Sequence, residues 1–250
     1  MDSEAQGPER LWPMAVRADG RRSSGSPSLD GADGVLPGPM GALVVLDHAG
    51  PRSARWSSER ALGVTDCAEP ETGRRPRPLD DAGWRELGEA YARGAEAVRR
   101  AGRTPILGID DDGLLQAALS PRTGGADDVA RLQRVLAIHR ACGPVDVALC
   151  VEELAPGGLD ATDGIEAARA LHAQGARTVF ASAGSHAFPP LLTRAKGSSV
   201  GDPALALRSA AWLVGRVPVR VVAVVDGDAA SLRTRALAFG LVGVAARGTP

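Results

Sequence analysis

The feature that most constrains the fold is a repeated alternation between short, largely apolar runs and longer amphipathic segments. Largely apolar runs are typical of parallel strands that are covered on both faces, and the amphipathic segments between them are typical of helices. The predicted strands are Ala42–Leu46, Pro105–Ile109, Val145–Val151, Thr178–Ser182, Val219–Val225 and Leu241–Ala245. The predicted helices are Asp80–Ala101, Asp127–Ala141, Asp160–Gln174, Pro203–Leu213 and Ala229–Phe239. The alternation predicts an α/β fold around a parallel sheet, either a closed barrel or a doubly wound sheet.

Chain length and glycine positions bear on that choice. The 250 residues fit one (β/α)₈ barrel near its lower size limit, or two small domains. No glycine-rich phosphate loop follows the first predicted strand, which argues against a dinucleotide-binding Rossmann domain. Gly102 and Gly175 directly follow two predicted helices, where glycine commonly ends a helix.

Two stretches of the chain lack an apolar period. Asp19–Pro39 consists mainly of Gly, Ser, Pro and Asp, and Pro51–Pro78 is rich in Arg, Glu and Pro. Both are predicted to be loops or linkers. Within the second, the run Gly73–Pro78 is either a solvated linker or an anion-binding patch.

Charge and cysteine content limit the partners and the compartment. The formal net charge of −1 gives no electrostatic reason to expect a nucleic acid. The three cysteines, Cys67, Cys142 and Cys150, lack metal-type spacing and are odd in number, which favours a reduced, intracellular protein with Cys142 and Cys150 as small core residues. Neither a signal peptide nor a run of about 20 apolar residues is present. We therefore expect a soluble, cytoplasmic protein without a membrane partner.

Six fragments keep the order of one known family along the chain. They are Pro13–Met14, Leu46–Arg52 (Leu-Asp-His-Ala-Gly-Pro-Arg), Gly113–Pro121 (Gly-Leu-Leu-Gln-Ala-Ala-Leu-Ser-Pro), Pro144–Leu159, Gly175–Gly184 with its Ser-x-Gly end, and Val244–Arg247. They resemble segments of the old yellow enzyme (NADH:flavin oxidoreductase) family, which has an FMN-dependent (β/α)₈ TIM barrel. The resemblance is greatest to the barrel of two-part flavin proteins that act on aryl-CoA substrates.

The resemblance implies a TIM barrel that is incomplete. Between Val16 and Ala42 there is no room for the family's second strand, its helix and the acceptor loop. The expected organisation is a remnant of strand one with a flexible linker in residues 1–40, followed by the barrel domain in residues 41–250. A barrel without its second strand could be open, with exposed strand edges. The linker or a protein partner would then cover the open edge.

The family's reaction is FMN-mediated hydride transfer from NAD(P)H to an activated alkene or a similar small-molecule acceptor. By resemblance, Asp111 and Asp112 stand at the positions of the family's substrate-binding pair. The residues placed by resemblance at the FMN site are Pro13, Met14, His48, Ser182, Gly184, Gly227 and Arg247.

Several polar groups that the family uses to hold the flavin are replaced. The Gln that hydrogen-bonds the flavin pyrimidine falls at Val45, and the Arg that stabilises the reduced ring falls at Ala148. The glycine pair at the phosphate falls at Val225–Gly227, or at Ala223 in another alignment, while Arg247 is retained. Losing one charge-assisted contact removes about 1.5–3 kcal/mol.

The family's substrate groups are replaced as well. Its His-x-x-His or His-x-x-Asn pair falls near Gly108 and Asp111, or near Ile109 and Asp112. Its proton-donating Tyr falls at Asp112 or Gly113. Acids at the site of a developing enolate would oppose its charge.

Three functional hypotheses follow. In the first, the chain is a pseudoenzyme, a structural or partner-binding remnant of the family. In the second, it is a working FMN oxidoreductase with unusual residues in contact with the flavin. In the third, the barrel is re-used as a metal-dependent lyase or hydrolase at Asp110–Asp112. For the last, the carboxylates expected around the barrel mouth would suit Mg²⁺. The further residues expected there are His48, Glu152, Glu153, His186 and Asp226. The interpretation that we favour is that Asp110–Asp112 is a short acidic turn in contact with solvent. No conventional metal-binding motif is present.

Overall fold

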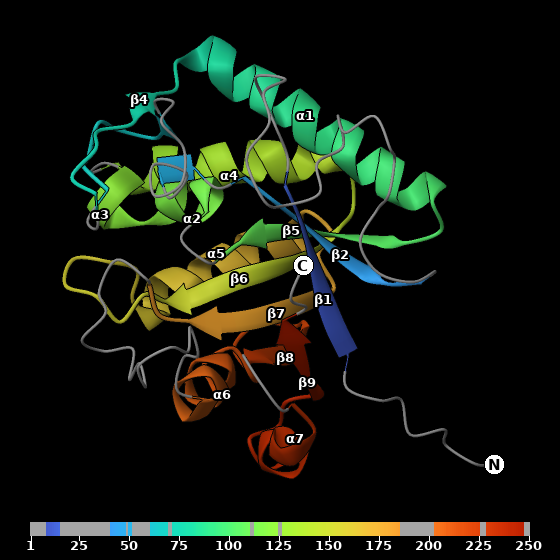
Figure 1. Cartoon of the computed structure of the whole chain (residues 1–250). Coiled ribbons are helices and arrows are strands. Elements are labelled where there is room, and N and C mark those ends of the chain that lie inside the picture. Colours follow the sequence, from blue (N-terminus) through green and yellow to red (C-terminus); the bar gives the residue numbers. More distant parts are fainter. Residues whose placement is uncertain are drawn as a thin grey trace.

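A computed structural model gives the fold of the chain (Figure 1). It describes residues 9–15, 41–48, 50–51, 61–69, 72–110, 113–124, 127–185, 203–225 and 229–247. The strands are β1 (Glu9–Ala15), β2 (Leu43–Asp47), β3 (Leu62–Gly63), β4 (Arg77–Pro78), β5 (Thr104–Ile109), β6 (Asp146–Glu152), β7 (Thr178–Ala183), β8 (Arg220–Val225) and β9 (Gly243–Arg247). The helices are α1 (Asp81–Arg100), α2 (Leu114–Leu119), α3 (Pro121–Gly124), α4 (Asp128–Cys142), α5 (Ala161–Ala173), α6 (Pro203–Ala211) and α7 (Ala229–Ala238).

The described strands close into a parallel barrel in the order β1-β2-β5-β6-β7-β8-β9. β1 pairs with β2 on one side, with Leu11 opposite Leu43, and with β9 on the other, with Glu9 opposite Ala245. The prediction of a shortened TIM barrel is confirmed. The alternative of an open barrel is wrong, because β1 pairs directly with the next strand of the barrel. The described strands therefore leave no open edge for a partner to cover.

All six strands and five helices predicted from the pattern are present, with ends that differ by at most two residues. The helix ends have local causes. Asp80, Asp127 and Asp160 cap α1, α4 and α5, each side chain accepting a hydrogen bond from a backbone N–H of the first turn. Gly102 and Gly175 follow α1 and α5 with φ of +68° and +107°, which favours glycine and stops the helix.

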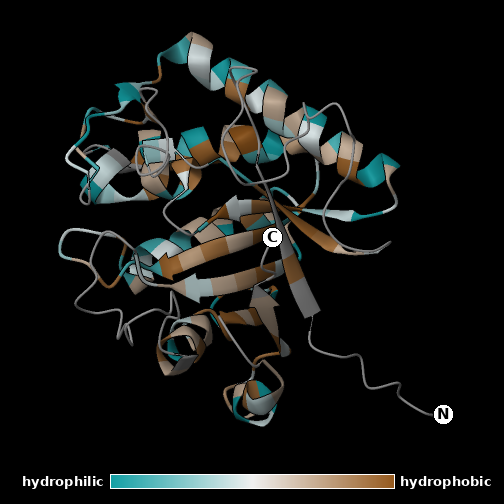
Figure 2. Cartoon of the chain, viewed as in Figure 1, coloured by the Kyte–Doolittle hydropathy of each residue, from teal (hydrophilic) through white to brown (hydrophobic). Residues whose placement is uncertain are grey.

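Two apolar clusters stabilise the barrel. The larger lies between the strands and the helices, and includes the outward-facing side chains of the strands together with the apolar faces of α1, α4 and α5. The smaller lies inside the barrel and is made of Leu11, Val45, Ile106, Ala148, Phe180, Val222, Val224 and Ala245. Figure 2 shows the strands as mainly hydrophobic, while hydrophilic residues are frequent on α1.

The stretch Pro51–Pro78 differs from the predicted linker where the structure describes it. β3 pairs with β4, and Leu62 and Val64 are buried. The buried Glu69 accepts hydrogen bonds from the backbone N–H and the hydroxyl of Thr72, both at 2.8 Å. This short apolar run and its buried acid fold the stretch against the barrel. Asp19–Pro39 lies outside the described residues.

No helix in the described part of the chain is both long enough and apolar enough to cross a membrane.

Candidate functional site at the carboxyl end of the barrel

The carboxyl ends of the parallel strands form one end of the barrel, where enzymes of this fold carry their sites. Of the predicted site residues, Pro13 and Met14 lie in β1, His48 directly follows β2, Ser182 and Gly184 lie at the end of β7, and Arg247 ends β9. Five other predicted residues, Asp111, Asp112, His186, Asp226 and Gly227, lie outside the described residues.

Asp110 and Ser182 meet at this end of the barrel. The Ser182 hydroxyl lies 3.4 Å from Asp110 Oδ2 and 3.4 Å from the carbonyl oxygen of Leu149, and donates toward both. Asp110 is 5% exposed and Ser182 is 7% exposed. The pair thus joins β5 to β7 across β6 as a buried polar contact.

His48 holds the turn after β2. Its ring Nδ1 accepts a hydrogen bond from the backbone N–H of Gly50 at 3.0 Å, and its carbonyl oxygen accepts one from Leu114 N at 2.7 Å. Gly50 has a φ of +53°, and a Cβ there would lie 2.8 Å from Leu114 Cα. These contacts give Nδ1 of His48 a structural task, fixing the turn against α2.

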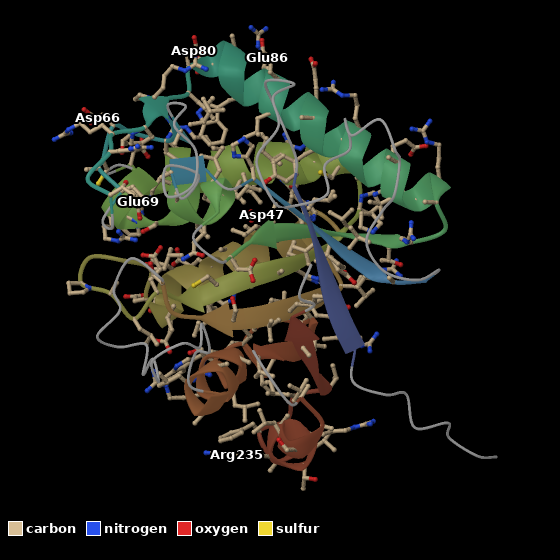
Figure 3. The ribbon with its side chains drawn as sticks, in the orientation of Figure 1. Asp47, Asp66, Glu69, Asp80, Glu86 and Arg235 are labelled. Atoms are coloured by element: carbon tan, nitrogen blue, oxygen red, sulfur yellow. The ribbon has the colours of Figure 1, made fainter. Side chains whose placement is uncertain are left out.

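Asp47, at the end of β2 (Figure 3), is a polar residue that the sequence did not single out. It is half-buried. A side chain at Gly113 would collide with Asp47 Oδ1, so the loop after β5 approaches this carboxylate closely. In the sequence, the feature that indicates such a close approach is the glycine that directly follows the acidic run Asp110–Asp112.

The interior positions at which the resemblance places flavin-holding groups are apolar. Val45 is 8% exposed and Ala148 is 1% exposed, and both belong to the interior cluster with Ile106 and Phe180. A Cβ at Gly108 would lie 3.0 Å from Val45 Cγ1 and 2.9 Å from the Leu46 carbonyl oxygen. These residues offer no side-chain donor or charge to the polar edge of a flavin ring. At Val45 and Ala148 the described chain therefore lacks the polar side chains that the resemblance places there.

Glu152 and Glu153 were predicted to ring the barrel mouth, but their carboxylates have other partners. Glu152 forms an ion pair with Arg208 at 2.9 Å and accepts a hydrogen bond from the Ser209 hydroxyl, so it binds α6. Glu153 is 2% exposed and lies in the network described next. Both residues do lie at the carboxyl end of β6, as predicted, but other elements of the fold supply counter-groups to their carboxylates.

The network around Glu153 is buried and polar. Its carboxylate accepts hydrogen bonds from Gln116 Nε2 at 3.2 Å, Ser120 Oγ at 2.8 Å and Leu159 N at 3.3 Å. Arg122 Nε lies 3.8 Å away as an ion-pair partner. Gln116 and Ser120 are both fully buried. The network ties the loop after β6 to α2 and α3.

Sequence reasoning found the fragments that carry this network but not their contact. Ser120 is the serine of the Leu-Ser-Pro fragment, and Leu159 ends the Gly-Gly-Leu fragment. A Cβ at Gly158 would collide with Glu153 Oε2, so a small residue is needed beside the carboxylate. The resemblance at these fragments therefore marks structural packing.

The cysteines match the prediction of small core residues. Burial raises the pKa of the Cys142 thiol to about 12, an increase that the nearby Arg99 partly offsets. The Cys150 thiol is buried and lies 3.4 Å from the Glu152 carbonyl oxygen and 3.5 Å from that of Gly184. A raised pKa keeps the Cys142 thiol protonated, so it lacks the thiolate character that a nucleophile needs.

In the described parts of the chain, no group of three His, Cys, Asp or Glu side chains is arranged to hold a metal ion. Asp110 is described, whereas its two neighbours in the acidic run are not.

No protein-family model matches the sequence, and no curated protein gives a significant match. Solved structures do match the fold. A complex of 2-naphthoyl-CoA reductase with 2-naphthoyl-CoA has a TM-score of 0.70 at 16% identity, over 84% of this chain and 36% of that one. Morphinone reductase has a TM-score of 0.66 at 16% identity, over 95% of this chain and 73% of that one.

The old yellow enzyme homologue from Zymomonas mobilis has a TM-score of 0.66 at 14% identity, over 95% of this chain and 75% of that one. This chain thus spans about a third of the naphthoyl-CoA reductase and about three quarters of the two shorter proteins. The resemblance to the old yellow enzymes that six sequence fragments indicated is confirmed for the fold: the chain is a shortened barrel of the old-yellow-enzyme type.

Proposed function

We propose that this chain is a divergent relative of the NADH:flavin oxidoreductases that no longer runs the family's hydride transfer and persists as a non-catalytic barrel in the cytoplasm. The observation that carries the proposal is the apolar interior at Val45 and Ala148, where the family would need a Gln and an Arg. Each missing charge-assisted contact costs about 1.5–3 kcal/mol, or roughly one to two powers of ten in rate.

The polar residues that are described near the site support the same proposal. His48 Nδ1 accepts from the backbone of its own turn, and Glu152 and Glu153 bind α6, α2 and α3. In a flavin reaction, the protein contributes by orienting the flavin ring and by stabilising the charge that develops on it. Residues whose groups are engaged in holding the fold do not provide those contacts.

The second candidate is a working FMN oxidoreductase that takes NAD(P)H and a small acceptor. Two observations favour it: the fold is shared with morphinone reductase, and Arg247 lies at the end of β9. The solved complex of 2-naphthoyl-CoA reductase holds an aryl-CoA, which suggests that class of acceptor for this candidate. FMN would supply hydride transfer; Arg247 and backbone groups near Ser182 and Gly184 would hold it.

A flavin-binding experiment separates the two candidates. The purified protein is titrated with FMN while quenching of the flavin fluorescence is followed, and NADH oxidation is then measured with the mixture. We expect no saturable quenching and no oxidation above that of free FMN. Stoichiometric binding that is lost in Arg247→Ala, but kept in the exposed-arginine control Arg235→Ala, would overturn the proposal in favour of the oxidoreductase.

The third hypothesis, a divalent-metal lyase or hydrolase at Asp110–Asp112, is tested by thermal unfolding with Mg²⁺ or Mn²⁺. A ligand that binds only the folded state raises the Tm. We expect no rise. A rise that disappears in Asp111→Ala but remains in Asp81→Ala, a variant of an exposed aspartate on α1, would support a metal site instead.

A further inference from the structure

Exposed apolar side chains gather in the last quarter of the chain. Of the five large hydrophobic residues that are exposed in the described part of the chain, four lie between residues 212 and 242. We call these four the α6–α7 patch: Trp212 (39% exposed), Leu237 (56%), Phe239 (42%) and Val242 (47%). The fifth, Val129, lies on α4.

The segments that carry the patch are adjacent. Trp212 follows α6. Leu237 lies in the last turn of α7 and Phe239 directly follows this helix, which is next to α6 in Figure 1. A Cβ at Gly240 would lie 3.1 Å from Val214 Cγ1, so the turns that follow the two helices touch. Val242 is joined to β8 through a 2.9 Å hydrogen bond to the Val221 carbonyl oxygen. The patch therefore lies at the amino ends of β8 and β9, opposite the candidate site.

Arginines accompany the patch. The sequence from residue 203 to residue 247 contains six Arg and two acids, Asp226 and Asp228, which directly follow β8 in the sequence at its carboxyl end. Two of the six lie elsewhere: Arg208 pairs with Glu152, and Arg247 is the last residue of β9. The other four make the rim of the patch: Arg216, Arg220, Arg233 and Arg235, all exposed.

The arginines are positioned beside the apolar residues. The Arg216 guanidinium stacks over the Trp212 ring, 5.1 Å from its centroid. Arg233 and Arg235 precede Leu237 and Phe239 by four residues, which places each pair on one side of the helix end. Figure 3 shows Arg235 beside α7 at the edge of the molecule, away from the acidic side chains labelled near α1.

We propose that the α6–α7 patch binds an acidic segment of a partner protein that also carries apolar side chains. Aromatic residues and Arg are enriched at protein interfaces, and Trp and Arg are among the residues that contribute most to binding. A rim of one sign of charge favours a partner of the opposite sign. The excess of Arg over acids in residues 203–247, with four of the Arg around the patch, makes the region complementary to carboxylates. The inference is independent of whether the barrel binds flavin.

The probe is a fluorescent synthetic peptide that alternates Glu with Leu and Phe at helical spacing, and its scrambled version is the sequence control. Binding is followed by fluorescence anisotropy at low and at moderate salt. Phe239→Ser and Arg235→Glu test the apolar and the charged part of the patch. Val129→Ser and Arg93→Glu are matched controls, because both side chains are exposed elsewhere on the barrel. The Tm of each variant checks that it folds.

We expect the peptide to bind better than its scrambled version and to bind more weakly as salt rises. Each patch variant should weaken binding at least about tenfold, which corresponds to 1.4 kcal/mol, while each control leaves it unchanged. Equal binding of the two peptides, or equal loss in patch and control variants, would overturn the proposal. A concentration-dependent dimer that Phe239→Ser abolishes would instead assign the patch to a second copy of the chain. Stronger binding to phosphatidylserine vesicles than to the peptide would assign it to an anionic membrane surface.

Discussion

Inside the barrel, Val45 and Ala148 pack as buried apolar side chains against Ile106 and Phe180, whereas just beyond the end of β6 a carboxylate of similar burial is held by four polar groups. In the interior, Val45 and Ala148 stand where the resemblance places polar groups for a cofactor. Around Glu153, every partner comes from the chain itself. The difference teaches that this barrel keeps buried polar groups where they join elements of its own fold.

The largest effect is expected at Glu153. Replacing Glu153 by Ala leaves Arg122, Gln116 and Ser120 without their shared acceptor, and breaking a buried pair in this way costs about 3–5 kcal/mol. Asp66→Ala is the control, since the side chains of the Arg75–Asp66 ion pair are 64% and 66% exposed and such pairs contribute up to about 1 kcal/mol. Urea unfolding measures both. Equal losses in the two variants would remove the distinction between the network and an ordinary surface pair.

The second prediction concerns the interior. Val45→Thr keeps the shape of the side chain but adds a hydroxyl to an apolar environment, which costs about 1–3 kcal/mol when no partner accepts it. Val129→Thr makes the same change on an exposed face of α4 and should stay within about 0.5 kcal/mol of the wild type. If the two variants unfold at the same urea concentration, the interior near Val45 contains a polar partner and our account of the apolar interior is wrong.

The same two regions separate what the sequence could predict from what it could not. Strands such as Pro105–Ile109 were predicted because their burial requires a run of apolar residues, and this depends on the local sequence alone. The correspondence of Val45 and Ala148 with the flavin-holding positions was predicted from the resemblance, which aligns these two strands with those of the family. The partners of Glu152 and Glu153 depend on distant segments, and a bulge opposite β7 shifts the register between Cys150 and Glu152. Such a bulge re-aims side chains in a way that residue types do not reveal.

The third prediction is a pH dependence that originates in the layer between strands and helices. Burial raises the pKa of Cys142 from 9.0 to about 12, so the unfolded chain releases this proton before the folded one does. The contribution of this thiol to the free energy of unfolding is therefore fully present below about pH 9. It is lost toward pH 12, by at most about 1.4 kcal/mol per pH unit. Urea unfolding at about pH 8 and about pH 10 should show a smaller decline in Cys142→Ala than in the exposed control Cys67→Ala. An identical decline in both would mean that the Cys142 thiol ionises as readily in the folded protein as in the unfolded chain.

The smallest effect is expected at Tyr91, a buried polar residue to which the contrast between the Glu153 network and the apolar interior does not extend. The hydroxyl of Tyr91 is buried, and within the described part of the chain no partner meets hydrogen-bond geometry with it, unlike the carboxylate of Glu153. Burial, and then the negative charge of Asp47, raises the pKa of Tyr91 well above 10, while the nearby backbone of His48 lowers it in part. Removing a buried polar atom that lacks a partner relieves its desolvation penalty, so Tyr91→Phe should be neutral or stabilising by up to about 1 kcal/mol. Tyr91→Leu is the comparison for loss of the ring, which should be destabilising. A clear loss of stability in Tyr91→Phe would mean that the hydroxyl bonds a water molecule or Asp47 in solution, and the rule that buried polar groups join elements of this fold would then extend to Tyr91.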